Sequence, residues 1–292
     1  LDGSSAASDV YKRQDLLVPG NLVEKVHAIV LTGGSAYGLD AASGVMAALE
    51  EEGVGLPVSE QTVVPIVPAA VLFDLNVGSS SVRPGVNWGY EAAQQANDSP
   101  ITSGNVGAGM GATVGKLLGP ARATKGGLGS ARIDLDNGFI VSALVAVNAV
   151  GEIVDTVSNT VVAGIRANDV GQYDSAIDVA IGNTAKVPVA GTNTTLGLIA
   201  TNANLSKTQL KKVAEMAHDG MARAIRPIHT QFDGDTVFAV SMPLSEVETT
   251  PDAQLNSIGI AGAKALEFAI VDAVRSAKSV GDVVACCDWH ID

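Results

Sequence analysis

The sequence is poor in cysteine and in positive charge, and each shortage excludes a class of protein. Its two cysteines, Cys286 and Cys287, are adjacent, and adjacent cysteines rarely form a bridge because disulfide geometry strains the peptide between them. Without a disulfide framework, we expect a cytoplasmic protein. Lysine and arginine number 18 against 31 aspartates and glutamates, which gives a formal net charge of -13. Nucleic-acid binding is not expected, because it depends on cationic groups that neutralise phosphates.

Long apolar runs and aromatic side chains are also scarce. Hydrophobic residues make up 47% of the 292 residues, yet no uninterrupted apolar run reaches the roughly 18 residues that a transmembrane helix needs. No signal peptide is recognisable at the start, and we expect no membrane partner. Aromatic residues are only 4%, while alanine, valine and glycine abound, which favours close packing of strands and helices in one large domain or two small ones.

The opening residues differ in character from the rest of the chain. Residues 1–14, "LDGSSAASDVYKRQ", are polar and rich in small residues. They resemble translated adapter sequence of the kind found at the ends of assembled environmental reads. We therefore expect residues 1–14 to be non-native or disordered, and native sequence to begin near Asp15.

Strand and helix patterns alternate along the chain. Residues 26–32 form an apolar run of strand length, and apolar residues recur at helical spacing over 39–49. Ser206 and Gln209 match a capping box that opens a second helix. Residues 156–189 have no strong period and are predicted to be a loop. The alternation indicates an α/β protein.

A glycine-rich stretch raises the possibility of nucleotide binding. Gly107, Gly109 and Ala112 have the spacing of a dinucleotide fingerprint, but no clear strand precedes them. Lys116 follows a glycine as in a P-loop, although Leu117 stands where that motif needs serine or threonine. The stretch is better interpreted as backbone that passes close to another group, and we expect no cofactor.

Other chemically active residues form only weak motifs on their own. Asp233 and Asp235, in a D-G-D triplet, are typical of a hairpin turn or a solvated loop. His218 and His229 lack metal-ligand spacing and are predicted to be structural. The cysteine pair with His290 lies at the chain end and is a poor metal candidate, so no metal is expected. No G-x-S-x-G elbow is present, which disfavours an ordinary serine hydrolase.

A pair of threonines precedes a buried apolar strand in the middle of the chain. In "VAGTNTTLGLIATNANL", Thr194 and Thr195 follow Asn193. One interpretation is a simple turn. The other is that the chain is cut after Asn193, which gives Thr194 a free α-amino group that titrates near neutrality and takes the hydroxyl proton. Nucleophile and base would then occupy one residue, and the spacing alone leaves both interpretations open.

Several segments in the same order carry a family resemblance over most of residues 15–280. Together they resemble the DmpA-like family of L-aminopeptidase/D-amidase-esterases and β-aminopeptidases, which are self-processing N-terminal-nucleophile hydrolases. The segments are "AIVLTGGSAYGLDAASGVM", "VPIVPAAVLFDL", "GNVGAGMGATVGK", "KGGLGSA", "ALVAVNAVG", "NTTLGLIATNANLSKTQ" and "MAHDGMARAIRPIHTQFDGDTVFAV".

The resemblance implies a fold, a cleavage and a set of site residues. The implied fold is a four-layer α/β/β/α sandwich, a single hydrolase domain over residues 15–292 that is cut between Asn193 and Thr194. The cut yields a larger fragment, 15–193, and a smaller one, 194–292. No cofactor or metal is implied, and a homo-oligomer, a tetramer or larger, is expected. The implied roles are Thr194 as nucleophile, Asp233 and Asp235 as its partners, Lys116 as a site cation and Asn148 as an oxyanion donor.

The resemblance leaves the substrate open. Many peptidase relatives process at a Gly–Ser junction, whereas Asn193–Thr194 followed by Asp233-x-Asp235 is similar to the 6-aminohexanoate (nylon) oligomer hydrolase branch. Phe73 stands in a segment where some relatives place a tyrosine, and it cannot supply a hydroxyl. The alternatives are an aminopeptidase for small peptides, an endo-type hydrolase of amide oligomers, and a binding or scaffold homologue that never matures.

Overall fold

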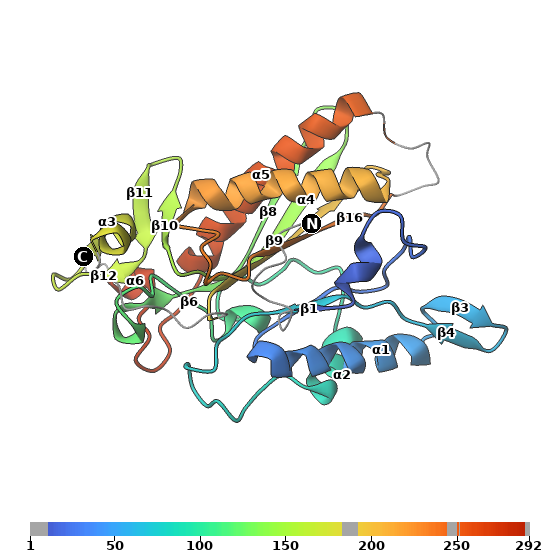
Figure 1. Ribbon diagram of the computed structural model, residues 1–292, viewed down its shortest axis with the longest axis horizontal. Coiled ribbons are helices and arrows are strands. Elements are labelled where there is room, and N and C mark those ends of the chain that lie inside the picture. Colours follow the sequence, from blue (N-terminus) through green and yellow to red (C-terminus); the bar gives the residue numbers. More distant parts are fainter. Residues whose placement is uncertain (1–10, 183–191, 244–249, 251, 290–292) are drawn as a thin grey trace.

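Two stacked β-sheets lie between two layers of helices in this computed structural model (Figure 1). The structure describes residues 11–182, 192–243, 250 and 252–289. Helices α4 and α5 cover the outer face of one sheet, and α1 and α2 lie on the far side of the other (Figure 1). This is the α/β/β/α layering expected from the sequence. The helices are α1 (Ala41–Glu51), α2 (Val86–Gln94), α3 (Ala176–Ile181), α4 (Lys207–Ala224), α5 (Asp252–Arg275) and α6 (Cys286–Trp289), with 3-10 helices η2 (Gln14–Leu17), η3 (Ser35–Asp40), η4 (Gly107–Gly109) and η5 (Pro120–Arg122).

The two layered sheets, a small three-stranded sheet of order β11-β10-β15 and three two-stranded pairs account for the described strands. One sheet has the order β1-β5-β2 and the other the order β16-β14-β9-β8. Their strands are β1 (Tyr11–Lys12), β2 (Val30–Thr32), β5 (Ala69–Val71), β8 (Gly127–Asp134), β9 (Ile140–Asn148), β14 (Thr194–Thr201) and β16 (Thr236–Ser241). The shorter strands are β3 (Leu56–Ser59), β4 (Thr62–Val64), β6 (Thr113–Val114), β7 (Thr124–Lys125), β10 (Glu152–Asp155), β11 (Thr160–Ala163), β12 (Ile165–Arg166), β13 (Tyr173–Asp174) and β15 (Ile225–Arg226).

Strand β14 occupies an interior position in the four-stranded sheet. It pairs antiparallel with β9 on one side and parallel with β16 on the other. Its alternate side chains point to opposite faces: Ile199 packs with the helix layer, and Leu196 packs with the sheet that contains β5. Thr194 shares the face of Leu196, so its side chain points into the layer between the two sheets.

The helix layer is built from a capped helix and one that packs closely on the sheet. The predicted capping box is confirmed, because the Ser206 side chain accepts from the Gln209 amide and the Gln209 side chain accepts from the Ser206 amide. Helix α5 crosses β8 at Gly129, where an added Cβ would lie 2.1 Å from the Ala269 carbonyl oxygen. A glycine at this position therefore permits the close approach of helix and strand.

One stretch differs from its prediction. Residues 156–189 were expected to form a loop, but the described part of this stretch contains β11, β12, β13 and α3. Residues 183–189 lie outside the described residues. The short strands have little periodicity of their own, and β11 is held by pairing with β10.

Residues 1–10 of the segment expected to be non-native also lie outside the described residues. Residues 11–12 form β1, which pairs antiparallel with β5. That native sequence begins near Asp15 stays a prediction.

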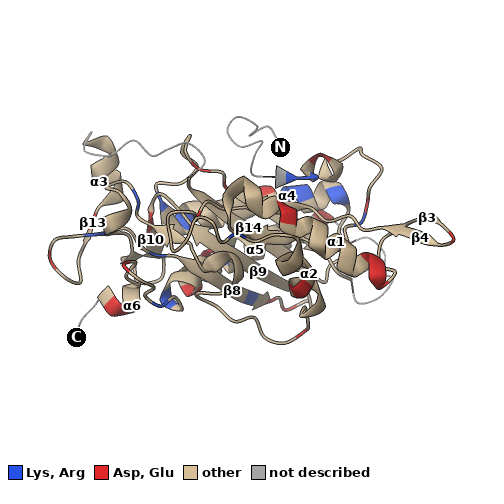
Figure 2. Ribbon diagram, turned by 90° about the horizontal axis from the view of Figure 1, so that it is seen from below, with Lys and Arg blue, Asp and Glu red and all other residues tan. Residues whose placement is uncertain are grey.

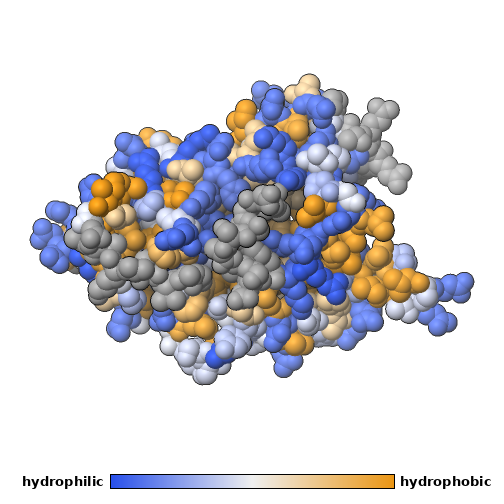
Figure 3. Space-filling model, viewed as in Figure 1, coloured by the Kyte–Doolittle hydropathy of each residue, from blue (hydrophilic) through white to orange (hydrophobic). Residues whose placement is uncertain are grey.

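The surface follows the acidic composition. Acidic positions are spread over several elements, including the end of α1 and the turn of the β3–β4 hairpin (Figure 2). Apolar side chains gather near that hairpin (Figure 3), where Leu56 is 47% and Val58 is 58% exposed. None of the helices among the described residues combines the length and the hydropathy that a membrane span requires. The expected homo-oligomer stays a prediction.

Gly129→Ala tests the contact between α5 and β8. The added methyl group would meet the Ala269 carbonyl oxygen at 2.1 Å and the Ala273 nitrogen at 2.4 Å. We expect the free energy of unfolding to fall by about 3 kcal/mol, because backbone atoms cannot move aside as a flexible side chain does. Urea unfolding measures the change. Gly85→Ala is the matched control, because nothing lies within 4 Å of a Cβ there; equal losses in the two variants would contradict the prediction.

Candidate active site

Thr194 is the first residue of β14 and lies between two of the predicted site segments. It is fully buried, with 0% exposure, and its Cα partner on β9 is Asn148. Directly opposite residues of an antiparallel pair have neighbouring side chains. On the other side of the strand, Asn193 forms a bridge with Asp233, just before β16. Strand register therefore brings together three regions that are far apart in the sequence.

The peptide bond between Asn193 and Thr194 carries two hydrogen bonds on its carbonyl oxygen. The Thr194 hydroxyl donates to the Asn193 oxygen at 2.6 Å, and the Gly234 amide donates to the same oxygen at 2.8 Å. Asn193 is 1% exposed, so water has little access. The hydroxyl thus lies against the bond that it would have to break, and a backbone donor already faces the oxygen that would become negative.

Lys116 reaches this bond from the loop after β6. Its Nζ donates to the Asn148 carbonyl oxygen at 2.9 Å, to Asn148 Oδ1 at 2.8 Å and to the Thr192 carbonyl oxygen at 3.2 Å. The backbone of this loop is fixed as well, because the Lys116 amide donates to Val150 O at 3.0 Å. The ammonium therefore contacts both Asn148 and the chain immediately upstream of the Asn193–Thr194 bond.

Burial makes Lys116 a titratable group near neutrality. Burial lowers the pKa of Lys116 to about 7, against the opposing charges of Asp233, Asp235 and Asp74. A lysine with a pKa in this range exchanges protons readily at physiological pH. The predicted site cation is thus also a group that could give or take a proton beside Thr194.

Asn148 is held at both ends of its side-chain amide. Its Oδ1 accepts from Lys116 and from the Thr113 amide at 3.0 Å, and its Nδ2 donates to the Phe73 carbonyl oxygen at 3.0 Å. A second, longer contact of 3.5 Å runs from Nδ2 to the Thr192 carbonyl oxygen. Phe73 therefore contributes through its main chain, and the oxyanion-donor role of Asn148 stays a prediction.

The two aspartates have different partners. Asp235 Oδ1 accepts from the Thr195 amide at 2.7 Å, which ties it to β14 one residue past Thr194. Asp233 Oδ2 accepts from the Thr230 amide at 3.0 Å and from its hydroxyl at 2.6 Å, within its own turn. Burial, together with the charge of Asp235, raises the pKa of Asp233 to about 6.

The backbone of the glycine-rich stretch passes close to other groups, as the sequence analysis predicted. An added Cβ on Gly109 would lie 2.2 Å from the Leu128 amide nitrogen, and one on Gly111 would lie 2.5 Å from an Asp74 carboxylate oxygen. Lys125 pins the same stretch, because its buried Nζ donates to carbonyl oxygens that include those of Gly109 and Ala112, at 2.7 and 2.9 Å.

Sequence reasoning missed three contributors. Lys125 opens the quoted segment "KGGLGSA" and Gly234 is the middle residue of the D-G-D triplet, but neither was assigned a role, and Gly234 acts through its backbone amide. His229 was predicted to be a hydrogen-bonded structural residue, and its partner, which the prediction did not identify, is Asp235: His229 Nδ1 lies 2.8 Å from Asp235 Oδ2. Its position shortly before the D-G-D triplet was the one available signal. No metal-binding group of histidines, cysteines or acids occurs among the described residues.

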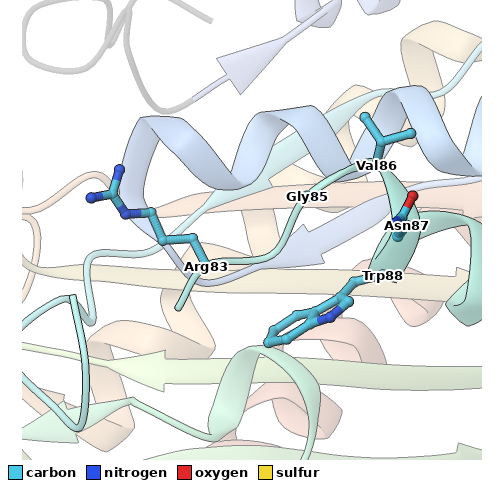
Figure 4. Close-up of a pocket in the computed structure, with 5 residues that line it drawn as sticks. All are labelled: Arg83, Gly85, Val86, Asn87 and Trp88. Atoms are coloured by element: carbon cyan, nitrogen blue, oxygen red, sulfur yellow. The ribbon is translucent and has the colours of Figure 1, made fainter. Parts of the chain in front are cut away.

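A surface pocket lies apart from these residues. It is a cavity of about 370 Å³ lined by Arg83, Gly85, Val86, Asn87 and Trp88. Arg83 and Trp88 point in different directions rather than converging (Figure 4). None of its lining residues belongs to the set around Thr194, so we assign it no chemistry.

The chain matches a family model and resembles curated proteins along most of its length. Residues 9–284 match the family model described as peptidase family S58. The chain is 40% identical over 303 residues to a protein of Mycobacterium leprae named an uncharacterized aminopeptidase, covering 94% of this chain and 79% of the relative. It is 34% identical over 244 residues to a 6-aminohexanoate-oligomer endohydrolase of Agromyces sp., covering 80% of this chain and 65% of the relative.

Solved structures support the fold. A Burkholderia β-aminopeptidase superposes with a TM-score of 0.58 at 21% identity, covering 83% of this chain and 65% of that chain. An L-aminopeptidase D-Ala-esterase/amidase of Ochrobactrum anthropi superposes with a TM-score of 0.57 at 18% identity, covering 85% of this chain and 68% of that one. The Ochrobactrum enzyme is described as a variant of the Ntn hydrolase fold. The expected fold class is confirmed.

Asp233→Asn tests the carboxyl whose pKa burial raises to about 6 from 3.8. A raised folded-state pKa means that Asp233 contributes stability at about pH 4 and below, and that this contribution is lost as the pH rises through about 6. Asparagine does not titrate. Relative to its parent, the variant should therefore gain about 1 to 2 kcal/mol in free energy of unfolding between about pH 4 and pH 7.

Urea unfolding of the Thr194→Ala and Thr194→Ala/Asp233→Asn chains measures this gain. Neither chain has the Thr194 hydroxyl, so the proposed cleavage cannot occur in either and the two are compared as intact polypeptides. A difference between the two chains that is the same at acid and neutral pH would contradict the predicted titration.

Proposed function

The chain belongs to peptidase family S58, and from that membership we propose that it is a self-processing amide hydrolase whose nucleophile is Thr194. The membership confirms the family resemblance drawn from the sequence and its enzyme class, a hydrolase of peptide bonds. One observation carries the finer proposal. The buried Thr194 hydroxyl lies 2.6 Å from the carbonyl oxygen of Asn193, and the Gly234 amide donates to that oxygen at 2.8 Å.

In the proposed maturation, Thr194 Oγ1 attacks the carbonyl carbon of Asn193. The hydroxyl proton passes to the departing amide nitrogen, the C–N bond breaks, and an ester joins the Asn193 acyl group to the Thr194 oxygen. Water then hydrolyses the ester, which leaves a carboxylate on Asn193 and a free α-amine on Thr194. The Gly234 amide stabilises the negative oxygen of the tetrahedral intermediate.

Lys116 and Asp235 support the nucleophile in this proposal. A cation beside the new α-amine lowers that amine's pKa and keeps it a base, and Lys116 contacts the chain just upstream through the Thr192 carbonyl oxygen at 3.2 Å. Asp235 fixes the first peptide group of the strand through its 2.7 Å bond from the Thr195 amide. Thr194 then stays aligned after its upstream bond is gone.

The Thr192–Asn193 segment, just before Thr194, occupies the place that a substrate acyl group would take. Lys116 Nζ and Asn148 Nδ2 both face the Thr192 carbonyl oxygen, at 3.2 and 3.5 Å. If Thr192 and Asn193 move away after cleavage, Lys116 Nζ and Asn148 Nδ2 can donate to a carbonyl group of the substrate instead. In turnover, Thr194 would take the acyl group with its own amine as base, release the substrate amine, and pass the acyl group to water.

The substrate class that we propose is a small peptide or amide oligomer with a free amino group. Asp233 and Asp235 place negative charge beside the nucleophile, which favours an ammonium group on the substrate. A relative named an aminopeptidase is 40% identical to this chain, and one named a 6-aminohexanoate-oligomer endohydrolase is 34% identical. An aminopeptidase is therefore the first candidate and an amide-oligomer hydrolase the second.

Thr194→Ala should abolish cleavage, because alanine has no nucleophile, whereas Thr194→Ser should keep partial cleavage. A denaturing gel and N-terminal sequencing measure this, and the smaller wild-type fragment should begin at Thr194. Thr195→Val is the matched control, because the Thr195 hydroxyl has no hydrogen-bond partner in the described structure. Cleavage of the alanine variant, or full activity of an uncut wild type, would disprove the mechanism.

Aminoacyl-p-nitroanilides should be hydrolysed faster than linear 6-aminohexanoate oligomers, by about tenfold or more in kcat/KM. Cleaved wild-type enzyme is assayed with both substrates, and the Thr194→Ala chain provides the blank. Preference for the oligomers would favour the endo-type hydrolase. Turnover of neither substrate by cleaved enzyme would count against both substrate classes.

A further inference from the structure

We propose that His229, backed by His218, is a positioning residue that holds the Asp235 carboxylate fixed against β14 beside the cleavage site. The inference rests on the proposed function, because it assigns two histidines to the same site. It concerns groups that act through Asp235 rather than groups that touch the reacting atoms.

The Asp235 carboxylate is bound on both sides. Its Oδ2 lies 2.8 Å from His229 Nδ1 and accepts from the His229 amide at 3.3 Å, while its Oδ1 accepts from the Thr195 amide at 2.7 Å. The Asp235 side chain is only 2% exposed, whereas that of His229 is 39% exposed. His229 therefore links solvent to a carboxylate whose other oxygen holds the residue after Thr194.

The backbone of His229 is strained in the conformation that makes these bonds. Its φ is 55°, in the left-handed region that residues other than glycine seldom adopt. Both its ring and its amide face the same Asp235 oxygen. A strained conformation persists only where the surrounding contacts enforce it, and such conformations cluster at functional sites.

His218 provides the second half of the arrangement from helix α4. Its Nδ1 lies 3.2 Å from His229 Nε2, and the two rings meet edge to face with centroids 4.9 Å apart. Because an ionised carboxylate only accepts, His229 Nδ1 must carry hydrogen. A cationic His229 also donates from Nε2, and His218 then accepts through Nδ1 as the neutral ring.

The charges around His229 favour this placement of one proton. Its hydrogen bond to Asp235 raises the pKa of His229 in opposition to burial, and the charges of Asp235 and Asp233 raise it further. The cation therefore persists to higher pH than that of an ordinary histidine.

The charges around His218 act in the opposite sense overall. Burial and then the charge of His229 lower the pKa of His218, although Asp235 and the α4 residues Asp219 and Glu215 act to raise it. From the other side of the site, the Lys116 cation faces Asp233. Of the two imidazoles, His229 is therefore the one that these charges favour as the cation.

His229→Asn separates the charge from the hydrogen bond. Asparagine tolerates a left-handed backbone, and its Nδ2 replaces Nδ1 as a donor, but it does not titrate. We expect the pH–rate profile of cleaved enzyme to lose the limb that follows the titration of His229, because asparagine neither gains nor loses a proton. At about pH 8, kcat should stay within about twofold of wild type.

His229→Ala removes the donor as well and should lower kcat about tenfold at every pH, with KM little changed. His27→Asn is the matched control, because His27 accepts from the Ile66 amide far from the site. Its profile should coincide with that of wild type. A His229→Asn profile that coincides with both would overturn the proposal.

A titration in the uncut Thr194→Ala chain tests the pair independently of cleavage. NMR of the imidazole nitrogens should give His229 a higher midpoint than His218, and Asp235→Asn should lower the His229 midpoint by about one pH unit. An unmoved midpoint overturns the proposal. An uncut, inactive wild type would instead refute the proposed function, and this titration would still decide the histidine inference.

Discussion

The register of β14 between β9 and β16 is the constraint on which the site depends. Antiparallel pairing sets Asn148 beside Thr194, and the parallel partner brings the Asp233–Asp235 turn to the other edge of the strand. A slip of one residue would turn Thr194 to the helix layer and away from Asn148. The apolar alternation that buries Leu196 on one face therefore also fixes the position of the candidate nucleophile.

Patterns within a short stretch of sequence predicted the secondary structure of that stretch. Pairing between distant strands determined the structure that these patterns did not predict. The Ser206–Gln209 capping box requires only neighbouring residues, and it opens α4 as expected. The stretch 156–189 was predicted to be a loop because β11, β12 and β13 are too short to carry a period. The family resemblance supplied Thr194 and Lys116, but their actual contacts depend on strand register and burial, which no single segment encodes.

Two buried ammonium groups organise the loop next to the site, and the atoms that bind them are largely carbonyl oxygens. Lys125 binds three carbonyl oxygens, including those of Gly109 and Ala112, and Lys116 binds the carbonyl and the side chain of Asn148. Burial lowers the pKa of Lys125 to about 8 and that of Lys116 to about 7. The glycines of the loop allow its backbone to turn these carbonyl oxygens toward the cations.

The interior position of β14 has a consequence for a chain end created there. Ordinary termini fray because few bonds hold them. A terminus at Thr194 would instead begin a strand that is hydrogen-bonded along both edges and packed between two layers of side chains. Pairing on both edges would hold the direction of its amine together with the Asp235 contact to the next residue, and the two polypeptides would remain joined by the same sheet that joined them as one.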